Sequence, residues 1–292
     1  MTQGSEPGSS RIVALKRGGD AKPLFMFAGV GGGPETFIDL AAQLGDERPI
    51  YGFHHIGALG ECEPVRQVSR MAQLYAAELR GVQPHGPYYL FGYSFGGAVV
   101  VELARELVTQ GERVGLVIMA DCPAPGYPRP APLLKRLKTH ADNLLGMHEQ
   151  RRSDYLRQRF NNLSTRIQKL AGLIPNDDHQ YLSEQVRRLE AALYESYRHY
   201  QALPIGLDVL FLTADTPPEW PTASFDDPLM GWGDVLRGRI SQCAIPGAHL
   251  TVFAPQNLPV MAARIRGALE RAQRAERRED RPSTVPLLVK SP

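Results

Sequence analysis

The sequence predicts an α/β fold in which a mostly parallel central sheet is flanked by helices. Short apolar runs alternate along the chain with segments of helical periodicity, which is the pattern of parallel strands joined by helices. Some runs, such as residues 114–120, are continuously apolar, as strands buried on both faces are. Between residues 124 and 203 the alternation stops and no strand is expected. Amphipathic stripes there predict a helical insertion, which we interpret as a lid over the site.

The predicted elements follow one another along most of the chain. The expected strands are residues 12–16, 24–29, 50–54, 88–92, 114–120, 209–213 and 239–245. The expected helices are residues 36–44, 67–82, 95–110 and 257–272, with apolar stripes over 156–170 and 182–193 predicting two more in the insertion. Residues 1–10 and 273–292, which are Gly/Ser-rich and charged respectively, are expected to be a linker and a flexible tail around a domain of residues 11–272.

Composition and charge argue against several classes of protein. Apolar residues make up 43% and charged residues 22% of the 292 residues, and the formal charge is only +2, so nucleic-acid binding is not expected. No apolar run approaches the roughly 18 residues of a membrane span, and the N-terminus has no apolar signal-peptide core. Cys62, Cys122 and Cys243 are scattered and fit a reducing cytoplasm. Without CxxC or HExxH spacing, no metal site is expected.

The strongest chemical signal is Gly-Tyr-Ser-Phe-Gly-Gly at residues 92–97. It fits the G-x-S-x-G pattern of a nucleophile elbow, and an apolar strand before it and an Ala/Val-rich helix after it give the context that the motif needs. The tight turn would place Ser94 at a helix N-terminus, where the N–H of Phe95 could stabilise an oxyanion. The alternative is a glycine-rich turn with an incidental serine, which the flanking elements disfavour. The motif therefore predicts an α/β-hydrolase fold with Ser94 as nucleophile.

A serine nucleophile needs a base and an acid. In hydrolases of this fold the base follows the last core strand, and Ile-Pro-Gly-Ala-His places His249 there. Asp121 and Asp215 each end a predicted strand, at the sheet edge where such folds build their sites. Either carboxylate could orient the imidazole, so these residues alone leave the acid open.

A second oxyanion donor is expected from the glycine-rich loop at residues 28–34. The sequence Ala-Gly-Val-Gly-Gly-Gly-Pro follows a predicted strand, and its glycines permit close approach of the backbone to a ligand. A phosphate-binding loop is the alternative. The G-x-G-x-x-G spacing does not fit cleanly, however, and no lysine follows as in a P-loop.

Taken in order, these motifs resemble the thioesterase domains that end nonribosomal peptide and polyketide synthases. The likeness runs from about residue 12 to residue 269 and rests on the glycine-rich loop, the elbow, Asp121 after its strand, the helical insertion and the ending Trp232…Pro-Gly-Ala-His249. The resemblance implies release of an acyl chain from the phosphopantetheine arm of a carrier protein through an acyl-enzyme on Ser94, by hydrolysis or cyclisation. It also implies no bound cofactor, and a carrier protein as partner in cis or in trans.

The resemblance also bears on the acid and the oxyanion hole. In the terminal domains the acid follows the same strand as Asp121, whereas in discrete editing thioesterases it follows the next strand, as Asp215 does. The likeness therefore favours Asp121, and it implies an oxyanion amide at Val30. A discrete editing thioesterase and a free carboxylesterase or lipase remain alternatives. A binding protein on an inactive hydrolase fold would need a broken triad, and this sequence retains serine, histidine and acid.

Overall fold

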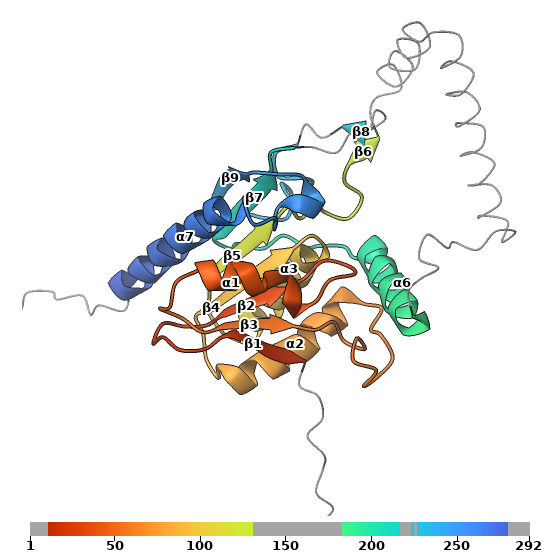
Figure 1. Cartoon of the computed structure of the whole chain (residues 1–292), viewed down its shortest axis with the longest axis horizontal. Coiled ribbons are helices and arrows are strands. Elements are labelled where there is room, and N and C mark those ends of the chain that lie inside the picture. Colours follow the sequence, from red (N-terminus) through yellow and green to blue (C-terminus); the bar gives the residue numbers. More distant parts are fainter. Residues whose placement is uncertain (1–10, 131–182, 217–222, 225–226, 280–292) are drawn as a thin grey trace, which may run out of the picture.

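The computed structural model describes residues 11–130, 183–216, 223–224 and 227–279 (Figure 1). Its centre is a seven-stranded sheet with the order β1-β3-β2-β4-β5-β7-β9. The strands are β1 (Ile12–Lys16), β2 (Leu24–Phe27), β3 (Ile50–Phe53), β4 (Tyr88–Tyr93), β5 (Val114–Ala120), β7 (Val209–Ala214) and β9 (Ile240–Ile245). β1 runs antiparallel to β3, and every other neighbouring pair is parallel. The predicted mostly parallel sheet is confirmed.

Helices cover both faces of this sheet (Figure 1). On one face α2 (Val68–Val82) and α3 (Phe95–Thr109) pack over Phe25 and Phe27 of β2. On the other face α1 (Ile38–Gln43), which follows the short helix η1 (Pro34–Phe37), and α7 (Leu258–Glu279) pack over Leu24 and Met26. Because alternate residues of a strand point to opposite faces, the continuously apolar strand serves both cores. This explains why the four residues of β2 are all apolar.

Helix α7 runs past the end that the sequence predicts for the last helix. The sequence predicts a helix ending at residue 272 and a flexible tail from 273, but α7 continues to Glu279. Residues 273–279 are all Ala, Arg, Glu or Gln, which are strong helix formers, although five of the seven are also charged. Glu276 also accepts a hydrogen bond from Tyr89 Oη at 2.8 Å. The extension is therefore tied to β4, and a charged composition alone does not mark a tail.

The insertion between β5 and β7 is described only at its two ends. Near its start, β6 (Arg129–Pro130) pairs antiparallel with β8 (Ala223–Ser224), although no strand is expected there. Strands of two residues leave no periodicity for sequence analysis to detect. At its other end α6 (Glu184–His199) confirms a helix in the second stripe. The stripe over residues 156–170 lies outside the described residues.

Helix α6 packs one face on the body of the protein. Its N-cap is Ser183, whose Oγ accepts the N–H of Val186 at 3.3 Å. Leu193 is buried in the core that α2 and α3 share, and Leu189 packs against that core. The stripe that predicts this helix therefore marks its buried face.

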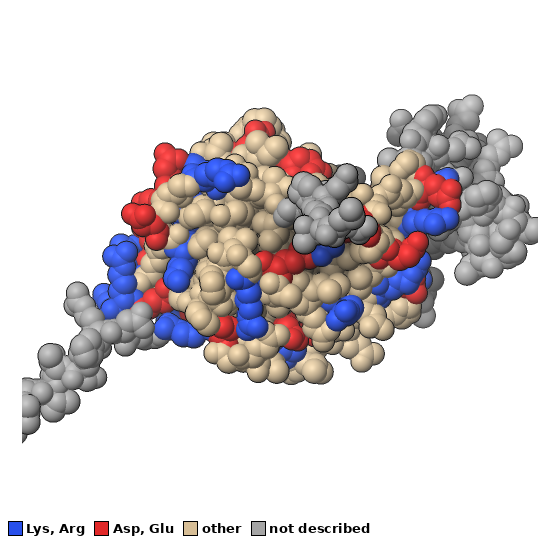
Figure 2. All heavy atoms as spheres, turned by 90° about the horizontal axis from the view of Figure 1, so that it is seen from below, with Lys and Arg blue, Asp and Glu red and all other residues tan. Residues whose placement is uncertain are grey.

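The surface mixes charges of both signs. Figure 2 shows Lys and Arg side chains interspersed with Asp and Glu on the face that it draws. This mixture accords with a net charge of +2. Within the described part of the chain, no helix is long and apolar enough to span a membrane.

Candidate active site

Ser94 occupies the turn between β4 and α3, with φ of 53° and ψ of −120°. A residue other than glycine seldom adopts a positive φ, and such strain is typical of functional sites. The turn is tight enough that a Cβ on Gly96 would lie 2.2 Å from the carbonyl oxygen of Phe27. This contact explains the small residue that the motif requires after Ser94. The structure thus has the strand, tight turn and helix that the G-x-S-x-G motif predicts around Ser94.

His249 reaches Ser94 from the loop after β9. Its Nε2 lies 3.0 Å from Ser94 Oγ, and its Nδ1 lies 2.6 Å from Asp121 Oδ2. Because a carboxylate only accepts hydrogen bonds, Nδ1 carries the proton and Nε2 is free to accept the Ser94 hydroxyl proton. Three side chains from separate loops therefore form one hydrogen-bonded line at the carboxyl ends of the strands.

The two candidate acids have different partners. Asp121 is buried, and its Oδ1 accepts the N–H of Ala214 at 2.9 Å while Oδ2 faces His249. Asp215 is exposed, and its Oδ1 accepts the N–H of Gly247 at 3.0 Å. The structure therefore brings Asp121, and not Asp215, to the imidazole. Asp215 instead holds the loop that leads to His249.

The glycine-rich loop lies directly against Ser94. A Cβ on Gly29 would approach Ser94 Cβ to 2.9 Å, so only glycine fits there. The N–H of Gly32 donates to the carbonyl of Gly29 at 3.1 Å, which closes a turn around Val30. Phe95 is the first residue of α3, and the N–H groups of a first helical turn have no acceptor within the helix. Phe95 thus directly follows Ser94, and Val30 follows the glycine that packs against Ser94.

Two residues near this site are missing from the sequence-based prediction. The hydroxyl of Tyr93 donates to the carbonyl of His249 at 2.6 Å, and the Tyr93 ring stacks on the imidazole at 5.2 Å. Burial raises the pKa of Tyr93, so the hydroxyl keeps its proton. His55 binds the carbonyl of Gly29 through Nε2 at 3.0 Å. Tyr93 belongs to the elbow motif but at a variable position, and only the strand register could have indicated His55.

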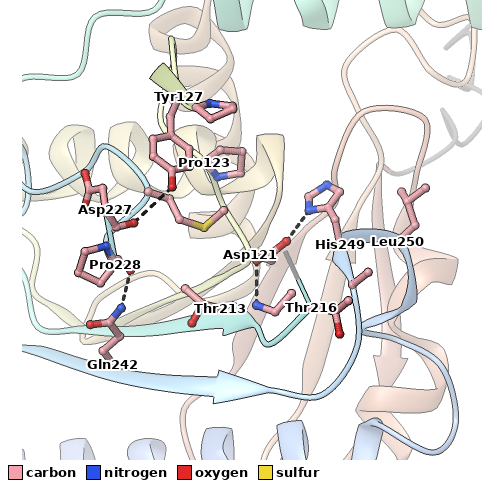
Figure 3. A pocket seen from close by; sticks show the side chains of 14 residues that line it. Asp121, Pro123, Tyr127, Thr213, Thr216, Asp227, Pro228, Gln242, His249 and Leu250 are labelled. Carbon is pink, nitrogen blue, oxygen red and sulfur yellow. Dashed lines mark hydrogen bonds and ion pairs between the residues drawn. The ribbon is translucent and has the colours of Figure 1, made fainter. Parts of the chain in front are cut away.

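A cavity of about 720 Å³ opens beside His249 and Asp121 (Figure 3). A second carboxylate in its wall, Asp227, accepts the N–H groups of Leu229 and Gly231 at 2.9 Å each. Backbone N–H groups therefore already satisfy both oxygens of the Asp227 carboxylate. The apolar lining residues include Pro123, Tyr127, Pro128, Pro228, Met230 and Leu250. Such a lining suits an apolar group better than a charged one.

The described residues contain no group of three His, Cys, Asp or Glu side chains that could hold a metal ion. Cys62, Cys122 and Cys243 are free thiols. Cys122 is buried beneath the elbow, where its Sγ donates to the carbonyl of Gly92 at 3.2 Å. Burial raises the pKa of this thiol, so it stays protonated and fills space below Ser94.

Comparison with known sequences gives one consistent family. The family model of the thioesterase domain matches residues 22–269. Malpinin synthetase of Mortierella alpina is 28% identical over 269 residues, which cover 92% of this chain and 3% of that protein. The dimodular nonribosomal peptide synthase of Bacillus subtilis (strain 168) is 38% identical over 121 residues, covering 40% of this chain and 5% of that protein. The chain thus spans only a few per cent of the length of these relatives.

Solved structures show the same fold. The NocB thioesterase domain in covalent complex with a fluorophosphonate nocardicin G analog matches with a TM-score of 0.58 and 22% identity, covering 88% of this chain and 99% of that chain. YbtT, a type II thioesterase from the yersiniabactin pathway, matches with a TM-score of 0.60 and 20% identity, covering 90% and 99%. A thioesterase domain and a type II thioesterase therefore both share this α/β-hydrolase architecture.

Proposed function

Because this chain belongs to the thioesterase domain family, we propose that it releases an acyl, peptidyl or polyketide chain from the phosphopantetheine thioester of a carrier protein. The observation that carries the proposal is the hydrogen-bonded line from Asp121 through His249 to Ser94. Several relatives are nonribosomal peptide and polyketide synthases, which supports a carrier protein, in cis or in trans, as the partner.

In the first half-reaction Ser94 Oγ attacks the thioester carbonyl while His249 Nε2 takes the hydroxyl proton. Asp121 keeps the imidazole in the required tautomer and stabilises the imidazolium. The N–H groups of Phe95 and Val30 would bind the oxyanion of the tetrahedral intermediate. Collapse breaks the C–S bond, and the phosphopantetheine thiolate takes the proton from His249. The acyl chain is then an ester of Ser94.

The second half-reaction reverses these roles. His249 removes a proton from water, or from a nucleophile within the acyl chain, which attacks the ester carbonyl. The same N–H groups bind the second oxyanion. Collapse returns the proton to Ser94 Oγ and releases an acid or a cyclic product. The apolar cavity beside His249 would hold part of the acyl chain during both steps.

The position of the acid supports the arrangement of a terminal domain over that of a discrete editing enzyme. Asp121 is the carboxylate that contacts His249, and Asp215 binds the Gly247 amide. A free carboxylesterase of the same fold is the second candidate. Such an esterase would hydrolyse small esters as readily as carrier-bound thioesters, and comparing the two rates distinguishes it from a thioesterase.

The proposal also assigns the parts of the chain. Residues 11–272 with the rest of α7 form the thioesterase domain, and residues 124–203 form its lid. Helix α6 supports this assignment because it lies over the oxyanion loop: a Cβ on Gly31 would be 2.9 Å from Glu190 Oε1. Gln185 Nε2 also donates to the carbonyl of Ala58 at 3.1 Å. The expected linker at residues 1–10 lies outside the described part of the structure.

Intact-protein mass spectrometry with acyl-carrier substrates tests the function. Wild-type protein should gain the mass of the acyl group, and the holo-carrier and released product should appear. Ser94→Ala should form no adduct and lose about 10⁶-fold in rate while keeping its circular dichroism. A fluorophosphonate should label Ser94 in the wild type. Labelling at another residue, or turnover by Ser94→Ala, contradicts the proposal.

A further inference from the structure

The register of the sheet brings a buried histidine to the oxyanion loop. β2 and β3 are parallel and pair Phe27 with Phe53, so Gly29 and His55, two residues further along, lie at neighbouring positions. His55 Nε2 is 3.0 Å from the carbonyl oxygen of Gly29, and His55 is only 5% exposed. Because a carbonyl oxygen only accepts, the proton of the ring must be on Nε2.

The carbonyl that His55 binds shares its peptide group with the N–H of Val30. The peptide group is planar, and in the trans form its C=O and N–H point in opposite directions. The same oxygen accepts the N–H of Gly32 at 3.1 Å, and Gly31 has a φ of +78°, as the third residue of a type II turn requires. Two hydrogen bonds therefore fix this carbonyl, and with it the direction of the Val30 N–H.

We propose that His55 is a positioning residue for oxyanion stabilisation, holding the Gly29–Val30 peptide so that the Val30 amide serves the Ser94 oxyanion. This inference rests on the proposed function and deepens it. The turn lies against Ser94, where a Cβ on Gly29 would meet Ser94 Cβ at 2.9 Å, so a small rotation of the peptide would move the donor. A hydrogen bond to the carbonyl also polarises the peptide and strengthens its N–H as a donor.

The surroundings of His55 suit a neutral donor. Burial lowers the pKa of the imidazole below its ordinary value, and the nearby His54 acts in the same direction, while the hydrogen bond to Gly29 and the carboxylate of Glu35 oppose the shift. The Phe95 ring lies edge-on to the imidazole at 5.9 Å between ring centres. A neutral ring at pH 7 binds the carbonyl without adding a charge beside the developing oxyanion.

Two variants of His55 test the inference. His55→Phe keeps a planar ring but removes the donor, and His55→Gln restores an N–H near the position of Nε2. His55→Phe should lower kcat on an acyl-carrier substrate about tenfold with KM unchanged, less than the 10²–10³-fold loss of an oxyanion donor itself. Its affinity for a trifluoromethyl ketone, which mimics the tetrahedral state, should fall by a similar factor. Binding of a non-cleavable thioether analogue should not change.

His55→Gln should recover most of the lost rate. His54→Phe is the matched control, because the neighbouring His54 ring makes no hydrogen bond to a described residue, and it should behave as wild type. If His55→Phe does not fold, His55→Asn replaces it, since the shorter amide cannot span to the Gly29 carbonyl as Gln can.

The possible outcomes distinguish a failure of the positioning role of His55 from a failure of the proposed thioesterase function. If His55→Phe and His55→Asn match the wild type, or if they weaken the thioether and the ketone equally, the positioning role is wrong while the thioesterase function stands. Failure of Gln to restore kcat in a folded protein also overturns the role. If the wild type leaves acyl-carrier substrates intact and a fluorophosphonate does not label Ser94, the proposed function itself is wrong.

Discussion

Asp121 has a positive φ of 48°, a conformation that asparagine, aspartate and glycine tolerate best. It follows the last residue of β5, and its N–H donates to the carbonyl of Leu212 at 2.7 Å. Both carboxylate oxygens are in use, one by Ala214 N–H and one by His249. These two contacts hold the carboxylate in one orientation, which is what an orienting acid needs, and the strained backbone is typical of a functional site.

Replacing Asp121 with Asn should lower kcat about 10⁴-fold. The amide is close in size, so the fold should persist, but its NH₂ group cannot accept the Nδ1 proton and favours the wrong tautomer of His249. Steady-state kinetics on a carrier-bound thioester, with thermal unfolding as a check on folding, measure the effect.

Asp215→Asn is the matched control for this change. Asp215 is exposed, and among the described residues its partners are loop groups, Gly247 N–H and Thr216 Oγ1. An Asn can still accept both hydrogen bonds. The rate should therefore fall by less than about tenfold. If the larger loss appears at Asp215, the enzyme uses the acid of the editing thioesterases and the contact with Asp121 is not catalytic.

Tyr93→Phe tests whether the Tyr93 hydroxyl helps to position His249. The variant keeps the ring that stacks on His249 and removes only the hydroxyl that binds the His249 carbonyl at 2.6 Å. A single hydrogen bond of this kind contributes about 0.5–1.5 kcal/mol, so we expect kcat to fall by about two- to tenfold. Rapid-quench measurement of acyl-enzyme formation should show the loss in the acylation step. An unchanged acylation rate would mean that stacking alone positions the imidazole.

At the scale of elements, hydrophobic periodicity predicts the strands and helices that burial stabilises. It does not predict an element's end where a single long-range contact sets it. The spans of β1 and β5 agree with the prediction residue for residue, because charged residues stand directly before and after each span. The end of α7 does not, because Arg, Glu and Ala fit a charged tail and an exposed helix equally well. Tyr89 and Glu276 are 187 residues apart in the chain, so no local pattern shows their contact.

Glu276→Ala should destabilise the protein by about 1–3 kcal/mol, the cost of leaving a buried hydroxyl without its acceptor. The hydroxyl of Tyr89 donates to Glu276 at 2.8 Å, and the Tyr89 side chain is buried. Urea unfolding followed by circular dichroism measures the free energy of unfolding. Glu270→Ala is the control on the same helix, since its pair with Arg274 is exposed and should contribute less than about 0.5 kcal/mol. Equal losses would show that helix propensity, not the contact, is measured.

At the scale of the whole molecule, the sequence predicts which residues form the candidate site, but it predicts less well how the fold brings them together. Ser94, His249 and two possible acids follow from the motif and from strand ends. Ser94 and His249 are 155 residues apart, and the folded sheet brings Asp121, rather than Asp215, to the imidazole of His249. The roles of these residues, and of Phe95 and Val30, stay predictions until kinetics test them.

The cavity is also a property of the whole molecule, because its walls come from β7, β9, the loop after β5 and the turn at residues 227–230. Its lining is mostly apolar, so burial of an acyl chain there should contribute about 0.8 kcal/mol per CH₂ group. We expect kcat/KM to rise up to about fourfold per added CH₂ across a series of carrier-bound acyl chains until the cavity is filled. A terminal carboxylate on the chain should remove this gain, because the charge would lose its hydration without a partner.

Met230 and Leu203 make this prediction specific to the cavity. Met230 lines the cavity, whereas Leu203 is 61% exposed and does not line it. Met230→Gln keeps the length of the side chain but introduces a polar group, and should flatten the dependence of kcat/KM on chain length. Leu203→Gln should leave the dependence as in the wild type. A slope that Met230→Gln does not change, or a preference for carboxylated chains in the wild type, would place the acyl chain outside this cavity, because an apolar wall contributes binding free energy only to a chain that it buries.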